Sequence, residues 1–168
     1  MATDLPRMFH TGMIVDSLDA SMHVFGVAFG YRWTEPTTFV GEIRTEGGVV
    51  EQAVRATYSM GGPHHVELVE ELRGDFLRPL GRSDRAHHLG FWSEALTADV
   101  GRLVDLGFRP EMTMSPVPGE YAGIAFLASP QGGLRVELVD VAHRPGIMQW
   151  INGGQAAFNV REGDFRVG

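Results

Sequence analysis

The stretch AHHLGFW, residues 86–92, repeats the pattern of an earlier stretch, FHTGMIV, residues 9–15. Each stretch carries a histidine two residues before a glycine and continues into a short apolar run. The two pairs are His10 with Gly12 and His88 with Gly90. A pattern that recurs in this way within one chain indicates an internal duplication, and a duplication constrains the whole fold.

The segments that follow the two histidines also correspond. Gly30 comes 20 residues after His10, and Gly107 comes 19 residues after His88. Each half then closes on nearly the same strand, HVELVE at 65–70 and RVELVD at 135–140. We therefore expect a single domain over 1–168, made of a module at about 8–70, a linker at 71–86, a second module at about 87–141 and a tail at 142–168.

The composition is that of an ordinary globular protein, with 43% hydrophobic and 21% charged residues among 168. A net charge of −7 argues against a nucleic-acid surface, which needs clustered basic residues. The absence of cysteine excludes disulfides and thiolate metal sites. The N-terminus shows no apolar signal core, and no apolar run approaches the roughly 20 residues that span a bilayer. We expect a cytoplasmic protein that binds neither nucleic acid nor membrane.

The first module predicts the order β-α-β-β-β. Asp16 or Ser17 caps its helix, and Gly30 ends it. The apolar face of this helix carries Met22, Phe25 and Phe29. Alternation and β-branched residues predict the four strands of this order at 8–15, 38–44, 49–60 and 65–69, and a further short strand at 31–33 directly after the helix.

The second module predicts the same order, with a helix at about 95–106. Its strands are expected at 87–92, from 108 onward, at 124–127 and at 134–139. The charged linker 71–86 predicts an exposed connection, and the Pro- and Gly-rich stretch 112–123 predicts a mobile loop. A short amphipathic helix is expected within 145–155, with Ile147, Trp150 and Ile151 on its apolar face.

Glu67 and Glu137 occupy equivalent positions in the two closing strands, each between two apolar residues. An acid in a core strand is unfavourable unless it is paired or binds a cation. His10 and His88 are equivalent in the opening strands, so a pseudo-twofold arrangement can bring all four residues around one point. Two imidazoles and two carboxylates suit one divalent metal ion, with open positions for water or substrate. Zinc, nickel, cobalt, manganese, iron and magnesium all fit this set.

Each residue alone has a plainer interpretation. A histidine at a strand end is more often structural or solvated than a metal ligand, and a strand glutamate can face solvent while its neighbours face the core. Four residues at equivalent positions of two repeats favour the metal site over these interpretations.

The two-module pattern resembles the vicinal oxygen chelate superfamily, which includes glyoxalase I, methylmalonyl-CoA epimerase, extradiol dioxygenases and bleomycin-resistance proteins. The resemblance covers about residues 8–141 and is closest to the epimerase-like branch in FHTGMIVDSLDASM and AHHLGFW. It implies an α+β fold in which two tandem β-α-β-β-β modules form one curved, cupped mixed sheet with helices outside. Metal ligands then come from the first and last strand of each module, at His10, Glu67, His88 and Glu137.

The resemblance implies a divalent-metal-dependent isomerase or epimerase. Such an enzyme moves a proton at a carbon next to a carbonyl of a bulky acyl or cyclic small-molecule substrate. Extradiol dioxygenases use two histidines and one carboxylate, bleomycin-resistance proteins bind their drug without a metal, and no basic cluster suggests a glutathione site. The alternatives are another metal-dependent lyase, hydrolase or dioxygenase of the superfamily, and a metal-free binding protein of the resistance type.

Epimerisation needs an acid and a base on opposite faces of the substrate. By resemblance to the glyoxalase branch, Glu137 is one of them. Glu51 resembles the catalytic glutamate of the epimerase segment, with Arg55 in that place if the register slips. His65 shares the expected inner face of Glu67, so it either lines the pocket or lies in a surface turn.

Three further residues border the expected pocket or its metal. Trp92 shares strand parity with His88 and forms either an apolar wall or ordinary core. Tyr121 either closes over the substrate or packs its own loop. His87 is expected to face away from His88. The resemblance and the apolar tail together predict a homodimer.

Overall fold

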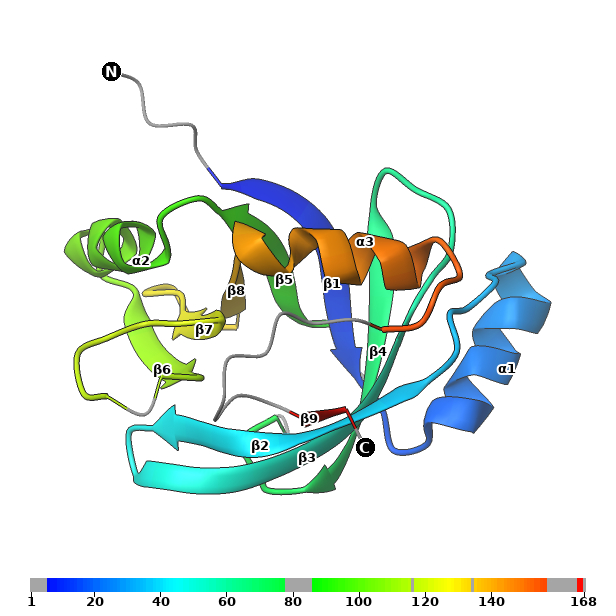
Figure 1. The fold of residues 1–168 in the computed structure, drawn as a ribbon, viewed down its shortest axis with the longest axis horizontal. Coiled ribbons are helices and arrows are strands. Elements are labelled where there is room, and N and C mark those ends of the chain that lie inside the picture. Colours follow the sequence, from blue (N-terminus) through cyan, green and yellow to red (C-terminus); the bar gives the residue numbers. More distant parts are fainter. Residues whose placement is uncertain (1–5, 78–85, 116, 134, 157–165, 168) are drawn as a thin grey trace.

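The computed structural model describes residues 6–77, 86–115, 117–133, 135–156 and 166–167. Each half folds as β-α-β-β-β, as the sequence predicted (Figure 1). The first half contains β1 (Arg7–Ile14), α1 (Leu18–Phe29), β2 (Thr37–Thr45), β3 (Gly48–Tyr58) and β4 (His65–Arg73). The second contains β5 (Ala86–Ser93), α2 (Leu96–Asp105), β6 (Arg109–Thr113), β7 (Ile124–Ala128) and β8 (Arg135–Asp140). A short 3-10 turn (Val141–His143), α3 (Arg144–Ile151) and β9 (Arg166–Val167) complete the elements.

The strands form one mixed sheet in the order β3-β4-β1-β5-β8-β7-β6-β2-β9. Because β2 also pairs with β3, the sheet curls into a barrel-like cup. β1 pairs in parallel with β4, and β5 does the same with β8. The two modules meet where β1 and β5 run antiparallel to each other. The opening strands of both modules therefore lie at the centre of the sheet, each beside the closing strand of its own module.

Helix α1 begins and ends where the local chemistry predicts. Ser17 caps α1 because its hydroxyl accepts from the Ala20 amide at 3.3 Å. Gly30 ends α1 with φ of 72°, a left-handed conformation that favours glycine. α3 buries the three expected apolar residues, Ile147, Trp150 and Ile151.

Three local expectations were wrong. Residues 31–33 form no strand, because only Trp33 bridges to Ser59. Phe29 is 71% exposed rather than part of a buried face, since α1 lies at the edge of the molecule and buries only Leu18 fully (Figure 1). The start of the expected exposed linker instead extends β4 to Arg73 and then buries Leu77 in the core. The rest of that linker, 78–85, lies outside the described residues.

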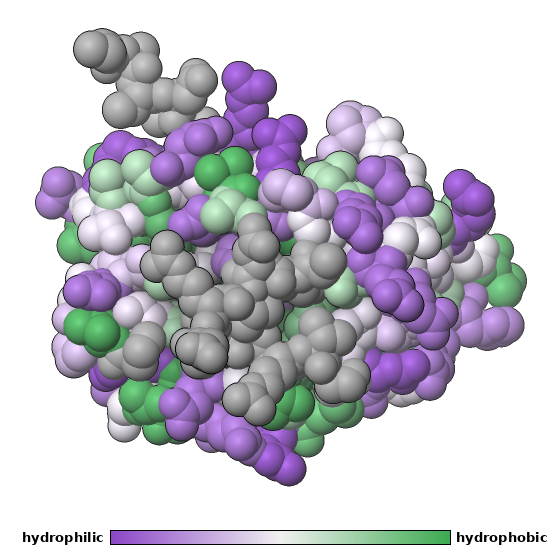
Figure 2. Space-filling view, in the orientation of Figure 1, coloured by the Kyte–Doolittle hydropathy of each residue, from purple (hydrophilic) through white to green (hydrophobic). Residues whose placement is uncertain are grey.

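The surface mixes hydrophilic and hydrophobic residues, and apolar side chains are exposed at the edge where α1 lies (Figure 2). Among the described residues, no helix has both the length and the apolar character needed to cross a membrane.

Candidate metal centre

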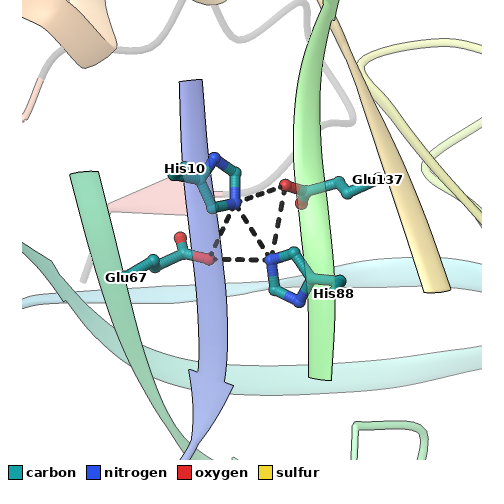
Figure 3. A group of neighbouring side chains, drawn as sticks. All are labelled: His10, Glu67, His88 and Glu137. Atoms are coloured by element: carbon teal, nitrogen blue, oxygen red, sulfur yellow. Dashed lines mark hydrogen bonds and ion pairs between the residues drawn. The ribbon is translucent and has the colours of Figure 1, made fainter. Parts of the chain in front are cut away.

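The four residues expected to meet at one point do so. His10 comes from β1, Glu67 from β4, His88 from β5 and Glu137 from β8, and their side chains converge between the strands (Figure 3). These four strands are consecutive in the sheet, and the alternation of side chains along each strand places all four residues on the inner face. One ligand atom from each residue lies within 4.8 Å of the others.

The register between the modules is reciprocal. Across the antiparallel β1–β5 pair, His10 lies opposite Gly90 and His88 lies opposite Gly12. A Cβ atom on Gly12 would come within 1.9 Å of the His88 ring, and a Cβ on Gly90 would come within 1.9 Å of the His10 ring. Each glycine of the repeated pattern thus provides the space that the other module's histidine occupies.

The distances describe a compact cluster. His10 Nε2 lies 3.0 Å from His88 Nε2, 3.0 Å from Glu137 Oε2 and 3.4 Å from Glu67 Oε2. His88 Nε2 lies 3.1 Å from Glu67 Oε2 and 3.6 Å from Glu137 Oε2. All four side chains are buried, with the Glu67 side chain the most exposed at 11%. Two carboxylates held this close in a buried site need a compensating positive charge.

The shifted pKa values of His10 and Glu67 reflect this requirement for positive charge. Burial alone would lower the pKa of His10, but the carboxylates of Glu67 and Glu137 outweigh it and raise the pKa to about 9. Burial alone would raise the pKa of Glu67, but His10 and His88 hold it well below the usual range. Without a metal, a proton on His10 therefore supplies part of the positive charge that the two carboxylates require.

The donor set fits a divalent cation. Glu137 Oε2 is buried and receives no hydrogen bond of acceptable geometry, although His10 Nε2 lies only 3.0 Å away. Four donor atoms that face one another, two of them from carboxylates, match the nitrogen and oxygen ligands of zinc and related ions. His10, Glu67, His88 and Glu137 would hold the ion.

A bound metal ion would replace the proton on His10. The stability that the metal adds to the fold should therefore depend on pH. The raised pKa of His10 stabilises the metal-free fold fully below its unfolded value of 6.5, and this contribution is lost as the pH rises through about 9. The increase in melting temperature caused by zinc should therefore be larger near pH 9 than near pH 6.5. Thermal melts with zinc and with chelator at both pH values measure it.

Replacing His10 should abolish this pH dependence. His10→Gln removes the titrating group from the cluster, whereas His23→Gln changes an exposed histidine of α1 and should leave the dependence intact. A zinc effect of equal size at both pH values in the unaltered protein would contradict the assigned role of His10.

His87 is closer to the site than expected. Its Nδ1 lies 3.0 Å from His88 Nδ1, and its Nε2 contacts the Arg135 guanidinium. The β1–β5 register slips by one residue at this point, because Gly12 pairs with His88 and Met13 pairs with Ala86. His87 is the extra residue of this bulge, which turns its side chain away from the direction that simple alternation predicts. Burial, His88 and Arg135 lower the pKa of His87 to about 3.

Tyr58 borders the site and did not stand out in the sequence. It is 5% exposed, pairs with Glu67 across the β3–β4 ladder and hydrogen-bonds the Glu67 carboxylate. Burial and the charge of Glu67 raise its pKa well above the usual value, so the hydroxyl stays protonated. Tyr58 could have been identified only from the pairing of β3 with β4, because this pairing places it directly opposite Glu67 on the same face of the sheet.

Four other expected site residues do not line the cavity over the cluster. Glu51 is exposed and forms an ion pair with Arg73, because the inward-facing residues of β3 are Gln52, Val54, Ala56 and Tyr58. Its proposed substitute, Arg55, lies on the same outer face and pairs with Asp19 of α1. Neither Glu51 nor Arg55 therefore reaches the cluster.

His65, Trp92 and Tyr121 lie elsewhere. His65 is buried with its Nδ1 on the Ser59 carbonyl at 3.0 Å. Trp92 stacks on Phe9 at 3.7 Å, and both His65 and Trp92 line a separate cavity beside α3. Tyr121 packs against the apolar cluster under α2 instead of covering His10, Glu67, His88 and Glu137.

The four-residue cluster opens onto a largely apolar cavity of about 130 Å³. Glu67, His88 and Glu137 contribute its polar end. Its aromatic lining consists of Phe39, Tyr58, Phe76, Phe126 and Trp150. Met112 and Met114 add flexible apolar surface. The arrangement can bind a small molecule whose polar atoms meet the cluster and whose body is apolar.

The fold is shared with solved structures. A methylmalonyl-CoA epimerase in complex with methylmalonyl-CoA and NH4+ is 23% identical over 82% of this chain and 95% of its own, with a TM-score of 0.54. The Mycobacterium tuberculosis methylmalonyl-CoA epimerase is 22% identical over 83% and 91%, with a TM-score of 0.53. A hypothetical protein from Bacillus halodurans is 18% identical over 80% and 94%, with a TM-score of 0.52.

Two sequence comparisons complete the assignment. The search of curated proteins gave no match. The family described as the glyoxalase/bleomycin resistance protein/dioxygenase superfamily matches residues 9–127, which include both histidine-glycine pairs. Together with the duplicated cup and its inward-facing cluster, this match shows that the chain belongs to the glyoxalase/bleomycin resistance protein/dioxygenase superfamily.

Proposed function

We propose that this protein is a divalent-metal-dependent isomerase or epimerase. It moves a proton at a carbon next to a carbonyl of a bulky acyl or cyclic compound. The observation that carries the proposal is the placement of two buried carboxylates, Glu67 and Glu137, on the strands that flank the central β1–β5 pair on either side (Figure 3). Carboxylates on two sides of one bound substrate can remove a proton from one face and return it to the other.

The metal and the carboxylates have separate tasks. A bound divalent cation would act as a Lewis acid that polarises the substrate carbonyl and stabilises the negative charge that develops. His10 and His88 would hold the ion with neutral imidazole nitrogens. The largely apolar walls of the cavity lower the local dielectric constant, which strengthens every charge interaction at its polar end.

Glu137 is the better placed of the two proton carriers. Its Oε2 is buried, borders the cavity and has one close imidazole partner, His10 Nε2 at 3.0 Å. Glu67, in contrast, is held by His88 at 3.1 Å and by the Tyr58 hydroxyl. The Glu137 carboxylate would therefore accept the proton when it is released from the ion, and Glu67 takes the opposite role that the exposed Glu51 cannot fill.

Hydrogen exchange with solvent tests the role of Glu137. Zinc-loaded protein in D2O should introduce deuterium next to the carbonyl of its substrate, with methylmalonyl-CoA and aryl α-hydroxy ketones as the first compounds to follow by NMR. Glu137→Gln keeps an oxygen at the ligand position but cannot carry the proton. It should lower the exchange rate by about 100-fold to 10,000-fold.

Glu51→Gln is the matched control, because Glu51 is an exposed glutamate on the outer face of the sheet. It should leave the exchange rate unchanged. Equal rates for Glu137→Gln and the unaltered protein would contradict the proposal for Glu137.

Two further expectations remain predictions. A homodimer is checked by the mass of the protein in solution, and a cytoplasmic location is checked by cell fractionation.

A further inference from the structure

The cavity has two aromatic walls, and each one meets a different metal-site histidine edge-on. On one side, the Tyr58 ring lies 5.4 Å from His10 at 83°, and Trp150 lies 5.3 Å from Tyr58 at 89°. Phe39 extends this wall, 5.7 Å from Trp150. These contacts fix the rings through edge-to-face geometry.

The second wall comes from the other side of the cup. The Phe126 ring lies 5.0 Å from His88 at 90°, and Phe76 lies 5.7 Å from Phe126. Tyr58 is on β3 and Phe126 is on β7, strands that four others separate in the sheet order. Both walls line the same cavity, so the metal residues lie at its end between two sets of rings.

The cavity offers little to a second charged group. The chain contains no lysine, and no arginine occurs among the described residues that line this space. The lining carboxylates are Glu67 and Glu137, which the metal would neutralise. An anionic tail inside the cavity would lose its hydration without an arginine or lysine to pair with, which is costly. Beside the cluster, the described lining offers the polar side chains of Gln52 and His143.

We propose that the substrate is a compound with a flat aromatic body, uncharged within the cavity, whose adjacent oxygens face the metal residues while its ring lies between the two aromatic walls. This inference rests on the proposed metal centre and specifies what it acts on. It separates this protein from an enzyme that would place an aliphatic or anionic acyl group in the same space.

Hydroxamates test the inference, because they bind a metal through two adjacent oxygens and can carry different bodies. Their affinities for zinc-loaded protein are measured by calorimetry. Benzohydroxamate should bind at least about tenfold more tightly than acetohydroxamate, because its ring buries apolar area. It should also bind about fivefold more tightly than cyclohexanecarbohydroxamate, which has similar bulk but no flat face. 4-Carboxybenzohydroxamate should bind at least about tenfold more weakly than benzohydroxamate.

A substitution in one aromatic wall tests whether the rings cause the preference for benzohydroxamate. Phe76→Leu should reduce the preference for benzohydroxamate over the cyclohexane compound to about one, with acetohydroxamate affinity unchanged. Phe108→Leu is the matched control, because this half-buried phenylalanine packs under α2, away from the cavity, and should keep the preference.

The outcomes separate this inference from the function on which it rests. If all the hydroxamates bind zinc-loaded protein with similar affinity, or if the carboxylated compound binds as tightly as its parent, the aromatic substrate is wrong and the metal centre stands. If none of them binds although zinc is present, the aromatic substrate is also wrong. Failure to bind any of zinc, nickel, cobalt, manganese and iron, measured directly by metal analysis, overturns the proposed function and this inference with it.

Discussion

Protein prepared without a histidine tag and incubated with zinc is expected to hold about one divalent ion per chain, and the His88→Ala/Glu137→Ala double variant is expected to hold none. The reason lies in the donor set. His10, Glu67, His88 and Glu137 each place one ligand atom within 4.8 Å of the others. Removing one nitrogen and one carboxylate leaves only two ligands, too few for a buried zinc site.

Elemental analysis after removal of free metal measures the stoichiometry. The matched control is His23→Ala/Glu51→Ala, which removes the same two residue types from exposed positions and should keep the ion. Circular dichroism shows whether each variant stays folded. If the unaltered protein holds no metal after incubation with zinc, nickel, cobalt, manganese and iron, the metal-dependent function is wrong. The cavity would then serve a metal-free binding protein.

Gly90→Ala is expected to weaken zinc binding by about 100-fold although it removes no ligand. The new Cβ would lie 1.9 Å from the His10 ring, so the ring must leave the position from which Nε2 faces the other three ligands. Gly12→Ala should have a similar effect through His88, because the geometry is reciprocal. A zinc titration monitored by calorimetry measures both affinities.

Gly101→Ala is the control for these glycine variants. No atom outside the helix lies within 4 Å of a Cβ at Gly101, which is an exposed position in α2. Alanine favours a helix more than glycine does, so this variant should bind zinc normally and gain slightly in stability. Unchanged zinc affinity in Gly90→Ala would show that the His10 ring does not need the space opposite it.

These predictions give the repeated sequence pattern a physical explanation. A histidine alone would provide a ligand, but β1 and β5 lie side by side, and each ring must pass over the neighbouring strand to reach the shared point. Only glycine leaves that strand without a side chain on the inner face. The ligand of one module and the glycine of the other therefore form one unit, which a single substitution in either module breaks.

The sequence by itself determined the duplicated fold and the four residues of the cluster. Two modules with the same order of elements place equivalent residues at equivalent positions, and side-chain alternation then decides which face each one occupies. His10 and His88, at the same place in two opening strands, could be paired without knowing any distance. Gly30 as the end of α1 also followed from local chemistry, whereas the sequence left its start open between Asp16 and Ser17 and the structure shows Ser17.

Only the tertiary structure decided what surrounds the cluster. Alternation within β3 says that Glu51 and Tyr58 face opposite sides, but the pairing of Tyr58 with Glu67 decides that Tyr58 faces inward. The bulge at His87 depends on how β5 aligns with β1, and the burial of Leu77 depends on the cup beneath it. Local periodicity is a property of one strand, whereas register, bulges and aromatic walls arise from contacts between segments far apart in the chain.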